Sequence, residues 1–398
     1  MIFADRLDYQ PEARSAAWDA TEERYPFPIS YRYFPLGESR SFVNTSRNGD
    51  RGMPSVRRIT LTFLPAVAAS LLIATSPNAN AETRGSLGLP AYADTVVDET
   101  NHRVFISGGK STNAVVVTDF SGNVRKTISG QYGATGLALS ADNRTLYVAQ
   151  ASGDAISAID TTTLTETARY ATGAQTCPTH LARTEGTIWF GYGCEENWTG
   201  GIGKLDTATT PPAVTLDLQG DAQYQRAPLL TAQPDADGPV VAGQPQLSPA
   251  NIRVYAVTAG KLESRGAGNV VGSDLADLSL SPDGATLYTA SGSRDHVEAF
   301  ATADLSRAGA YHTGSYPNSV ATSADGKYLA TGVRNPRDDA YLYKTGGAVP
   351  ENTLNITDSG VLAPRGLTWA DGTRKLLAIT TPPNGTTPTL HVINRPFD

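Results

Sequence analysis

Cysteine and histidine are the side chains of this 398-residue chain that are best suited to metal binding, redox chemistry or proton transfer. The two cysteines, Cys177 and Cys194, form an even pair, which is typical of a disulfide in an exported protein. The alternative is a metal site, which would need two further ligands, with His180 as the nearest candidate. We favour the disulfide and predict no bound metal.

The histidines do not form an obvious catalytic group. They lie at unrelated positions, namely His102, His180, His296, His312 and His391. Only His180 and His312 are expected to come near each other. The sequence also lacks a Gly-x-Ser-x-Gly elbow, a His-Glu-x-x-His motif, a phosphate-binding loop and a haem-attachment pair. We therefore predict no catalytic residues and no cofactor.

Short β-strands are the elements that must position these residues. Residues 137–160 read LALSADNRTLYVAQASGDAISAID, which is three apolar runs separated by the turns ADNR and ASGD. Six further copies of this pattern begin near residues 96, 180, 234, 278, 319 and 366. A small sheet of this kind cannot bury both faces alone, so the copies are expected to pack against one another.

One turn recurs in every copy and sets the period of the repeat. Its marker residues are Asn101, Asp142, Glu185, Asp237, Asp283, Asp325 and Asp371. They are 41 to 52 residues apart, which is typical of four-stranded propeller blades. We interpret these acids as turn formers rather than catalytic groups, because Asp and Asn tolerate left-handed backbone and bond it locally. The predicted fold is all-β, a seven-bladed β-propeller of four-stranded antiparallel blades.

The repeats SADNRTLYVA…DAISAID and SPDGATLYTA…DHVEAF resemble the YVTN-type repeat family of β-propellers, found in bacterial secreted and surface proteins. The resemblance covers nearly everything after about Gly88. It implies the fold and brings no catalytic motif, because the shared residues are turn and core positions.

The two ends of the chain are predicted to close the ring. The last repeat supplies three strands and ends at Asp398, where the other repeats supply four. We expect residues 84–89 to pair antiparallel with residues 390–394 as the fourth strand, because an open edge would leave unpaired backbone groups.

The first 81 residues are predicted to lie outside this domain of residues 82–398. Residues 53–81 have a basic start at Arg57 and Arg58, an apolar run and the end Ala79-Asn80-Ala81, which indicates a secretory signal peptide. Residues 1–52 are interpreted as a disordered upstream extension. A single membrane anchor is the alternative, but the apolar run is short and contains Pro65. The general secretory route is favoured over twin-arginine export, because Val56 precedes the arginine pair.

Ligand binding is expected at one mouth of the channel, on the loops between second and third strands and the segments that lead into each blade. The candidate residues there are aromatic or charged, suited to stacking or to meeting carboxylates and sugar acids: Tyr132, His180, Trp198, Arg226, Arg294, Asp295, Tyr316, Arg334 and Arg337.

Function follows from the fold and from what the sequence lacks. The net charge of −7, without a basic run, argues against nucleic acid as a partner. We predict a secreted or cell-surface protein, monomeric and without stable membrane insertion after cleavage. It would act as a binding scaffold for a protein, glycan, cell-wall or small-molecule ligand. The alternative is a channel-centred hydrolase or lyase, which would need convergent polar groups in the channel.

Overall fold

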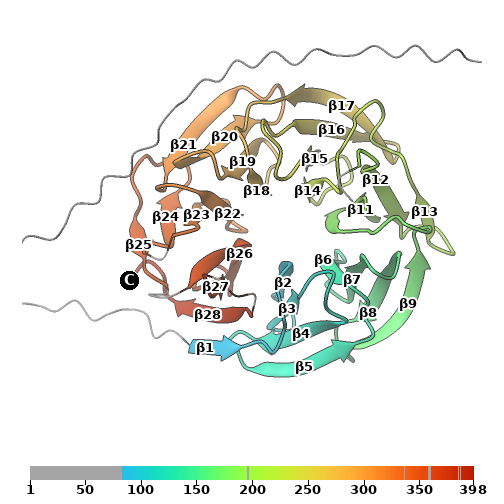
Figure 1. Ribbon diagram of the computed structural model, residues 1–398, viewed down its shortest axis with the longest axis horizontal. Coiled ribbons are helices and arrows are strands. Elements are labelled where there is room, and N and C mark those ends of the chain that lie inside the picture. Colours follow the sequence, from blue (N-terminus) through green and yellow to red (C-terminus); the bar gives the residue numbers. More distant parts are fainter. Residues whose placement is uncertain (1–82, 195–196, 336, 357–359, 384, 386) are drawn as a thin grey trace, which may run out of the picture. The chain divides into compact units, whose positions relative to one another are not determined.

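The computed structural model describes residues 83–194, 197–335, 337–356, 360–383, 385 and 387–398. These residues form 28 β-strands in seven four-stranded antiparallel sheets, and no helix occurs among them. The sheets are arranged radially around a central channel, as blades are in a propeller (Figure 1). The seven-bladed β-propeller predicted from the repeats is therefore confirmed.

In six blades the strands follow one another in sequence from the channel outward (Figure 1). Blade 1 contains β2 (Asp94–Asp98), β3 (Arg103–Ser107), β4 (Ala114–Asp119) and β5 (Val124–Ser129). Blade 2 contains β6 (Ala134–Leu139), β7 (Thr145–Gln150), β8 (Ala155–Asp160) and β9 (Thr165–Ala171). Blade 3 contains β10 (His180–Thr184), β11 (Thr187–Tyr192), β12 (Gly201–Asp206) and β13 (Ala213–Thr215).

The remaining blades continue around the ring. Blade 4 contains β14 (Leu229–Ala232), β15 (Val240–Gly243), β16 (Ile252–Thr258) and β17 (Lys261–Gly268). Blade 5 contains β18 (Leu275–Leu280), β19 (Thr286–Ser291), β20 (His296–Ala301) and β21 (Arg307–His312). Blade 6 contains β22 (Pro317–Thr322), β23 (Tyr328–Val333), β24 (Ala340–Lys344) and β25 (Asn352–Leu354). Blade 7 contains β26 (Val361–Ala370), β27 (Lys375–Thr381) and β28 (Thr389–Asn394), with β1 (Thr83–Ser86) outside them.

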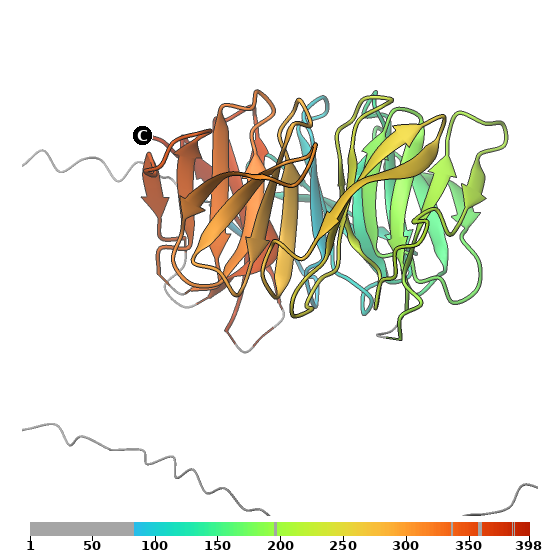
Figure 2. The same cartoon turned by 90° about the horizontal axis from the view of Figure 1, so that it is seen from above.

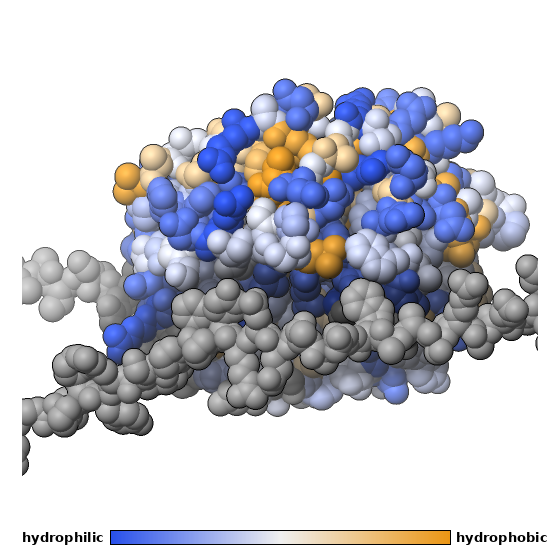
Figure 3. All heavy atoms as spheres, turned by 45° about the horizontal axis from the view of Figure 1, so that its top comes forward, coloured by the Kyte–Doolittle hydropathy of each residue, from blue (hydrophilic) through white to orange (hydrophobic). Residues whose placement is uncertain are grey.

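The core lies between neighbouring blades rather than within any one of them. In β3, Val104 and Ile106 are buried in a cluster with residues of blade 7, whereas Phe105 is buried in a cluster with residues of blade 2. This division follows from the two-residue period of a strand, which points alternate side chains to opposite faces. Outer strands such as β5 and β9 lie at the rim of the ring, and most of their side chains are exposed. The visible surface is correspondingly hydrophilic, with only small hydrophobic patches (Figure 3).

The recurring turn is structural, as its residue types indicate. Asp142 Oδ1 accepts a hydrogen bond from Ser140 Oγ at 2.6 Å and from the Arg144 backbone nitrogen at 3.1 Å. Asp283 and Asp325 make the same pair of contacts in blades 5 and 6. These carboxylates satisfy the backbone of the hairpin between the first and second strands.

Closure by the two chain ends is also confirmed. Strand β1 pairs antiparallel with β28, with Thr83 opposite Val392 and Ser86 opposite Thr389. The expected boundaries were wrong by a few residues: the strand ends at Ser86, and Leu87 and Leu89 are buried in the core between blades 7 and 1 instead. Their apolar side chains gain more from burial there than from an exposed outer edge.

Strands run between two layers of loops when the ring is seen from the side (Figure 2). Within the described residues there is no helix of the length and apolarity that would cross a membrane. The predicted signal peptide and upstream extension lie outside the described residues.

Candidate functional site

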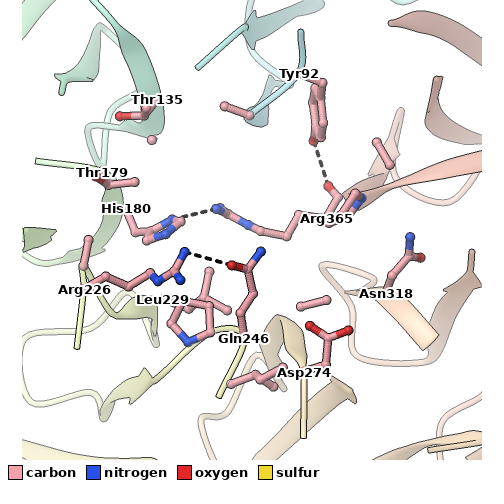
Figure 4. Close-up of a pocket in the computed structure, with 18 of the residues that line it drawn as sticks. Tyr92, Thr135, Thr179, His180, Arg226, Leu229, Gln246, Asp274, Asn318 and Arg365 are labelled. Atoms are coloured by element: carbon pink, nitrogen blue, oxygen red, sulfur yellow. Dashed lines mark hydrogen bonds between the residues drawn. The ribbon is translucent and has the colours of Figure 1, made fainter. Parts of the chain in front are cut away.

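A cavity of about 830 Å³ occupies one mouth of the channel, and it is called the mouth cavity below (Figure 4). Its walls come from the two kinds of segment expected to carry function. Lys110, Gly292 and Arg334 lie between second and third strands, whereas Tyr92 and Asp274 lie on segments that lead into innermost strands. Each blade contributes to the wall because these segments all converge on the channel axis.

Four of the nine residues singled out from the sequence line the mouth cavity: His180, Arg226, Tyr316 and Arg334. The other five do not line it. Tyr132 is half exposed, with the Arg169 guanidinium 5.4 Å from its ring centroid. Trp198 is 56% exposed on the loop between β11 and β12. Arg337 is exposed, and its backbone nitrogen bonds Asn335 Oδ1.

Arg294 and Asp295, the remaining two, interact within blade 5. The Arg294 Nε lies 3.3 Å from the buried Glu298 carboxylate, and Asp295 Oδ1 lies 2.7 Å from His296 Nδ1. His312 lies on the outer strand of the same blade, with its ring 5.9 Å from that of His296. The expectation that His312 meets His180 was therefore wrong, because His180 opens an innermost strand of blade 3.

Arg365 lies at the centre of the channel, and it was not among the residues predicted from the sequence. Arg365 lies on β26, where the pairing with β27 jumps from Leu362 to Leu367. The extra residues form a bulge, and Arg365 adopts a left-handed backbone with φ of 60°. The sequence signal was Pro364-Arg365-Gly366, since proline and glycine inside a strand pattern mark a bulge.

Arg365 reaches across the channel toward His180 (Figure 4), and its contacts join four blades. Its Nη2 lies 2.9 Å from Asp94 Oδ1 of blade 1, and its Nε lies 3.9 Å from Asp277 Oδ1 of blade 5. Its Nη1 lies 2.9 Å from His180 Nδ1 of blade 3. Tyr92 Oη donates to the Arg365 carbonyl at 2.8 Å. We call these five residues the central cluster.

Both aspartates of the central cluster also join neighbouring blades. Asp94 Oδ2 accepts from the Leu137 nitrogen of blade 2 at 2.9 Å, and Asp277 Oδ2 accepts from the Val320 nitrogen of blade 6 at 2.8 Å. Each carboxylate therefore holds a backbone donor of the next blade while it faces the Arg365 guanidinium. Replacing either group would disturb the ring as well as the channel.

Burial dominates the electrostatics of the cluster. It raises the pKa of Asp277 to about 7, against the opposing effect of Arg365 and two backbone donors. The pKa of Asp94 is also raised by burial, although Arg365 bonds it directly. Burial, with the Arg365 charge, lowers the pKa of His180 well below its ordinary value. One guanidinium cannot fully neutralise two buried carboxylates. Asp277 lies farther from Arg365 than Asp94 does, and it keeps its proton up to a pH near neutrality.

The hydrogen bond to Arg365 fixes the tautomer of His180. A guanidinium has donors and no acceptor, so His180 Nδ1 must be the acceptor in this bond. A neutral imidazole then carries its proton on Nε2. His180 accordingly offers the mouth cavity a hydrogen-bond donor rather than a general base.

A second cavity of about 530 Å³ lies beyond the central cluster, and Arg365 lines both cavities. Its wall is mixed, with polar residues such as Glu99 and Arg183 beside apolar ones such as Val97, Leu137 and Leu181. The central cluster thus separates the two ends of the channel.

The predicted disulfide between Cys177 and Cys194 is present, with Cα atoms 5.0 Å apart. Cys177 precedes β10 by three residues and Cys194 follows β11 by two, which places the bridge at the end of two adjacent strands. Within the described part of the chain, the one group of potential metal ligands within mutual reach is Asp154 with these two cysteines. Their sulfurs are already bonded to each other.

Comparisons with known proteins establish the fold alone. No protein-family model and no curated protein matches the sequence. A chain in a crystal structure of a mitotic checkpoint complex is 15% identical, with a TM-score of 0.61, over 85% of this chain and 98% of that one. A chain of hydrazine synthase from Kuenenia stuttgartiensis is 16% identical, with a TM-score of 0.56, over 79% of this chain and 98% of that one.

Proposed function

We propose that the protein is an exported, monomeric binding scaffold of the YVTN-type repeat family, whose ligand occupies the mouth cavity. The observation that carries this proposal is the position of its exposed aromatic side chains. Three aromatic residues of the described chain are largely exposed, namely Tyr132, Trp198 and Tyr316, and all three lie on loops of this mouth. Exposed aromatics beside a cavity are typical of binding surfaces, because they bury large areas at little conformational cost.

The disulfide supports the exported location. Disulfides persist in oxidising compartments, and Cys177–Cys194 lies at the edge of the mouth cavity, where it ties together two segments of the wall. Lys110 Nζ donates to the Cys194 carbonyl at 2.9 Å and links this segment to blade 1. A rim fixed in this way is suited to a ligand that meets a preformed site.

An enzyme acting in the channel is the second candidate, and two observations favour it: polar groups converge in the central cluster, as such an enzyme requires, and the pKa of Asp277 is raised. A buried carboxyl with a pKa of about 7 is a suitable general acid or base near neutral pH. Asp277 does not line the mouth cavity, however, and His180 has no free acceptor nitrogen in this arrangement. Both features favour binding over proton transfer.

Filling the mouth cavity tests the proposal. Ala276 lines the mouth cavity and Ala324 lines the cavity at the other end. We expect Ala276→Trp to lower the affinity for ligands found in a screen of saccharides, cell-wall fragments and peptides by tenfold or more, and Ala324→Trp to leave it unchanged. Equal affinity in both variants would count against the mouth cavity. Turnover of a bound compound that is lost in Asp277→Asn would establish the enzyme instead.

A further inference from the structure

One backbone position recurs at the mouth in blades 2, 5 and 6. It is the residue directly before the innermost strand, and its carbonyl accepts a hydrogen bond from the loop after the second strand. The three bonds run from Ala151 N to Gly133 O (2.9 Å), from Gly292 N to Asp274 O (2.9 Å), and from Arg334 N to Tyr316 O (3.0 Å). The backbone is left-handed at all three positions, with φ of 65°, 58° and 63°. These three blades therefore share a left-handed residue at this position.

Glycine is the residue that adopts this backbone without strain, and blade 2 has Gly133. Blade 5 has Asp274 and blade 6 has Tyr316 at the same position. A bulky side chain in left-handed backbone is strained, and Tyr316 gains little from burial in return, because it is 56% exposed. Strain of this kind persists only where the surrounding structure fixes it, and it is concentrated at functional sites.

The side chains of Asp274 and Tyr316 lean over the same glycine. A Cβ atom placed on Gly292 would lie 2.7 Å from Asp274 Oδ2 and 3.1 Å from Tyr316 Cδ1. Arg334 is tied to Tyr316 by its backbone, and all four residues line the mouth cavity. The Asp274 carboxylate and the Arg334 guanidinium are both exposed. The Asp274 and Tyr316 side chains thus meet at one place on the rim, between blades 5 and 6, and Arg334 adjoins them through its backbone.

We propose that Asp274, Tyr316 and Arg334 form a subsite for a sugar ring of an oligosaccharide. The face of Tyr316 would stack on the apolar face of a pyranose. The Asp274 carboxylate would accept hydrogen bonds from ring hydroxyls, and Arg334 would donate to hydroxyl or carboxylate oxygens. Together these three side chains supply the stacking face, the acceptor and the donor that a polyhydroxylated ring requires. The inference rests on the proposed binding function and names its ligand class.

Tyr316→Gly is the decisive variant because it separates binding from stability. It removes the stacking face and relieves the backbone strain. We expect a melting temperature that is unchanged or higher by roughly 1–3 °C. We also expect a tenfold or greater loss of affinity in calorimetry against a panel of cellotetraose, chitotetraose, maltotetraose and trigalacturonate. Tyr316→Phe should keep the affinity, whereas Asp274→Asn should lower it about fivefold or more.

His102→Gly is the matched control, because His102 is also an exposed ring side chain on left-handed backbone, with φ of 52°, but lies in the turn between β2 and β3, at the other end of the channel from the mouth cavity. It should bind the panel as the wild type does. If the wild-type protein bound none of the four saccharides, or if Tyr316→Gly bound them undiminished, the subsite would be disproved. If the protein instead bound a peptide, and Ala276→Trp abolished that binding, the proposed binding function would hold although the sugar subsite would not.

Discussion

Arg365 illustrates how one residue organises the channel. Its guanidinium is partly buried and faces Asp94 and Asp277, with side-chain exposures of 19%, 9% and 9%. Removing one partner of a buried ionic group leaves the others uncompensated. The central cluster is therefore expected to matter for stability as well as for the shape of the mouth cavity.

We predict that Arg365→Met destabilises the protein by about 3–5 kcal/mol, because it leaves two buried carboxylates without their cation. Arg374→Met is the control. Arg374 forms an ion pair with Asp371 at the surface, where its side chain is 76% exposed, so its loss should change stability by less than about 1 kcal/mol. Urea unfolding at pH 7 measures both values. Similar losses in the two variants would show that the central cluster contributes no special stability.

The raised pKa of Asp277 predicts a pH dependence of known sign. The folded chain keeps this proton up to about pH 7, whereas the unfolded chain loses it near the ordinary value of 3.8. Because the folded state binds more protons between these values, the free energy of unfolding should fall as the pH rises from 4 to 7. The contribution of Asp277 is up to about 4 kcal/mol.

Asp277→Asn should reduce the slope of this part of the stability profile, measured by urea unfolding at pH 4, 5.5 and 7, and should leave the share that comes from the raised pKa of Asp94. Asp283→Asn is the comparison, because Asp283 lies in an exposed turn and hydrogen bonds from Ser281 lower its pKa. Its titration falls below this pH range, so the slope of the wild type should persist. An unchanged slope in Asp277→Asn would mean that another group causes the dependence.

At the scale of elements, β1 is the strand whose contribution to stability can be measured separately. Its four residue pairs with β28 complete blade 7, whereas Leu87 and Leu89 pack into the core without belonging to the strand. A chain that starts at Leu87 would therefore lose the strand and keep the buried leucines. We predict that it unfolds several degrees below a chain that starts at Thr83, since each backbone hydrogen bond contributes about 1 kcal/mol.

Differential scanning calorimetry of the two chains tests this prediction. Equal melting temperatures would show that β1 does not close the ring in solution. The disulfide and the pairing of the two termini act on different blades, so both chains should keep the Cys177–Cys194 bridge.

At the scale of the whole molecule, the predicted cleavage site is compatible with the position of the first strand. Cleavage after Ala81 would release a chain that starts at Glu82, which keeps all of β1 because that strand begins at Thr83. We predict this N-terminus for the secreted protein, read by N-terminal sequencing or mass spectrometry. Ala81→Arg should block cleavage and retain the leader. Secreted material that begins before Met53 would contradict the signal-peptide interpretation.

The sequence alone determined the blades, their number, the closing strand and the disulfide. Each of these depends on short-range patterns: alternating apolar residues, Asp or Asn turns at a fixed period, and a cysteine pair that flanks one hairpin. Physical chemistry that acts over a few residues repeats in every blade, so seven copies reinforce one another.

Only the tertiary structure decided which side chains meet in the channel. Asp94, His180, Asp277 and Arg365 are far apart in the chain and lie on four different blades, so no local pattern links them. Their meeting depends on ring closure and on a bulge that turns Arg365 toward the axis. In the same way, the strain at Tyr316 becomes visible only when its backbone is compared with that of Gly133 in blade 2. Side-chain type can be read from a sequence, but convergence and backbone strain follow from long-range packing.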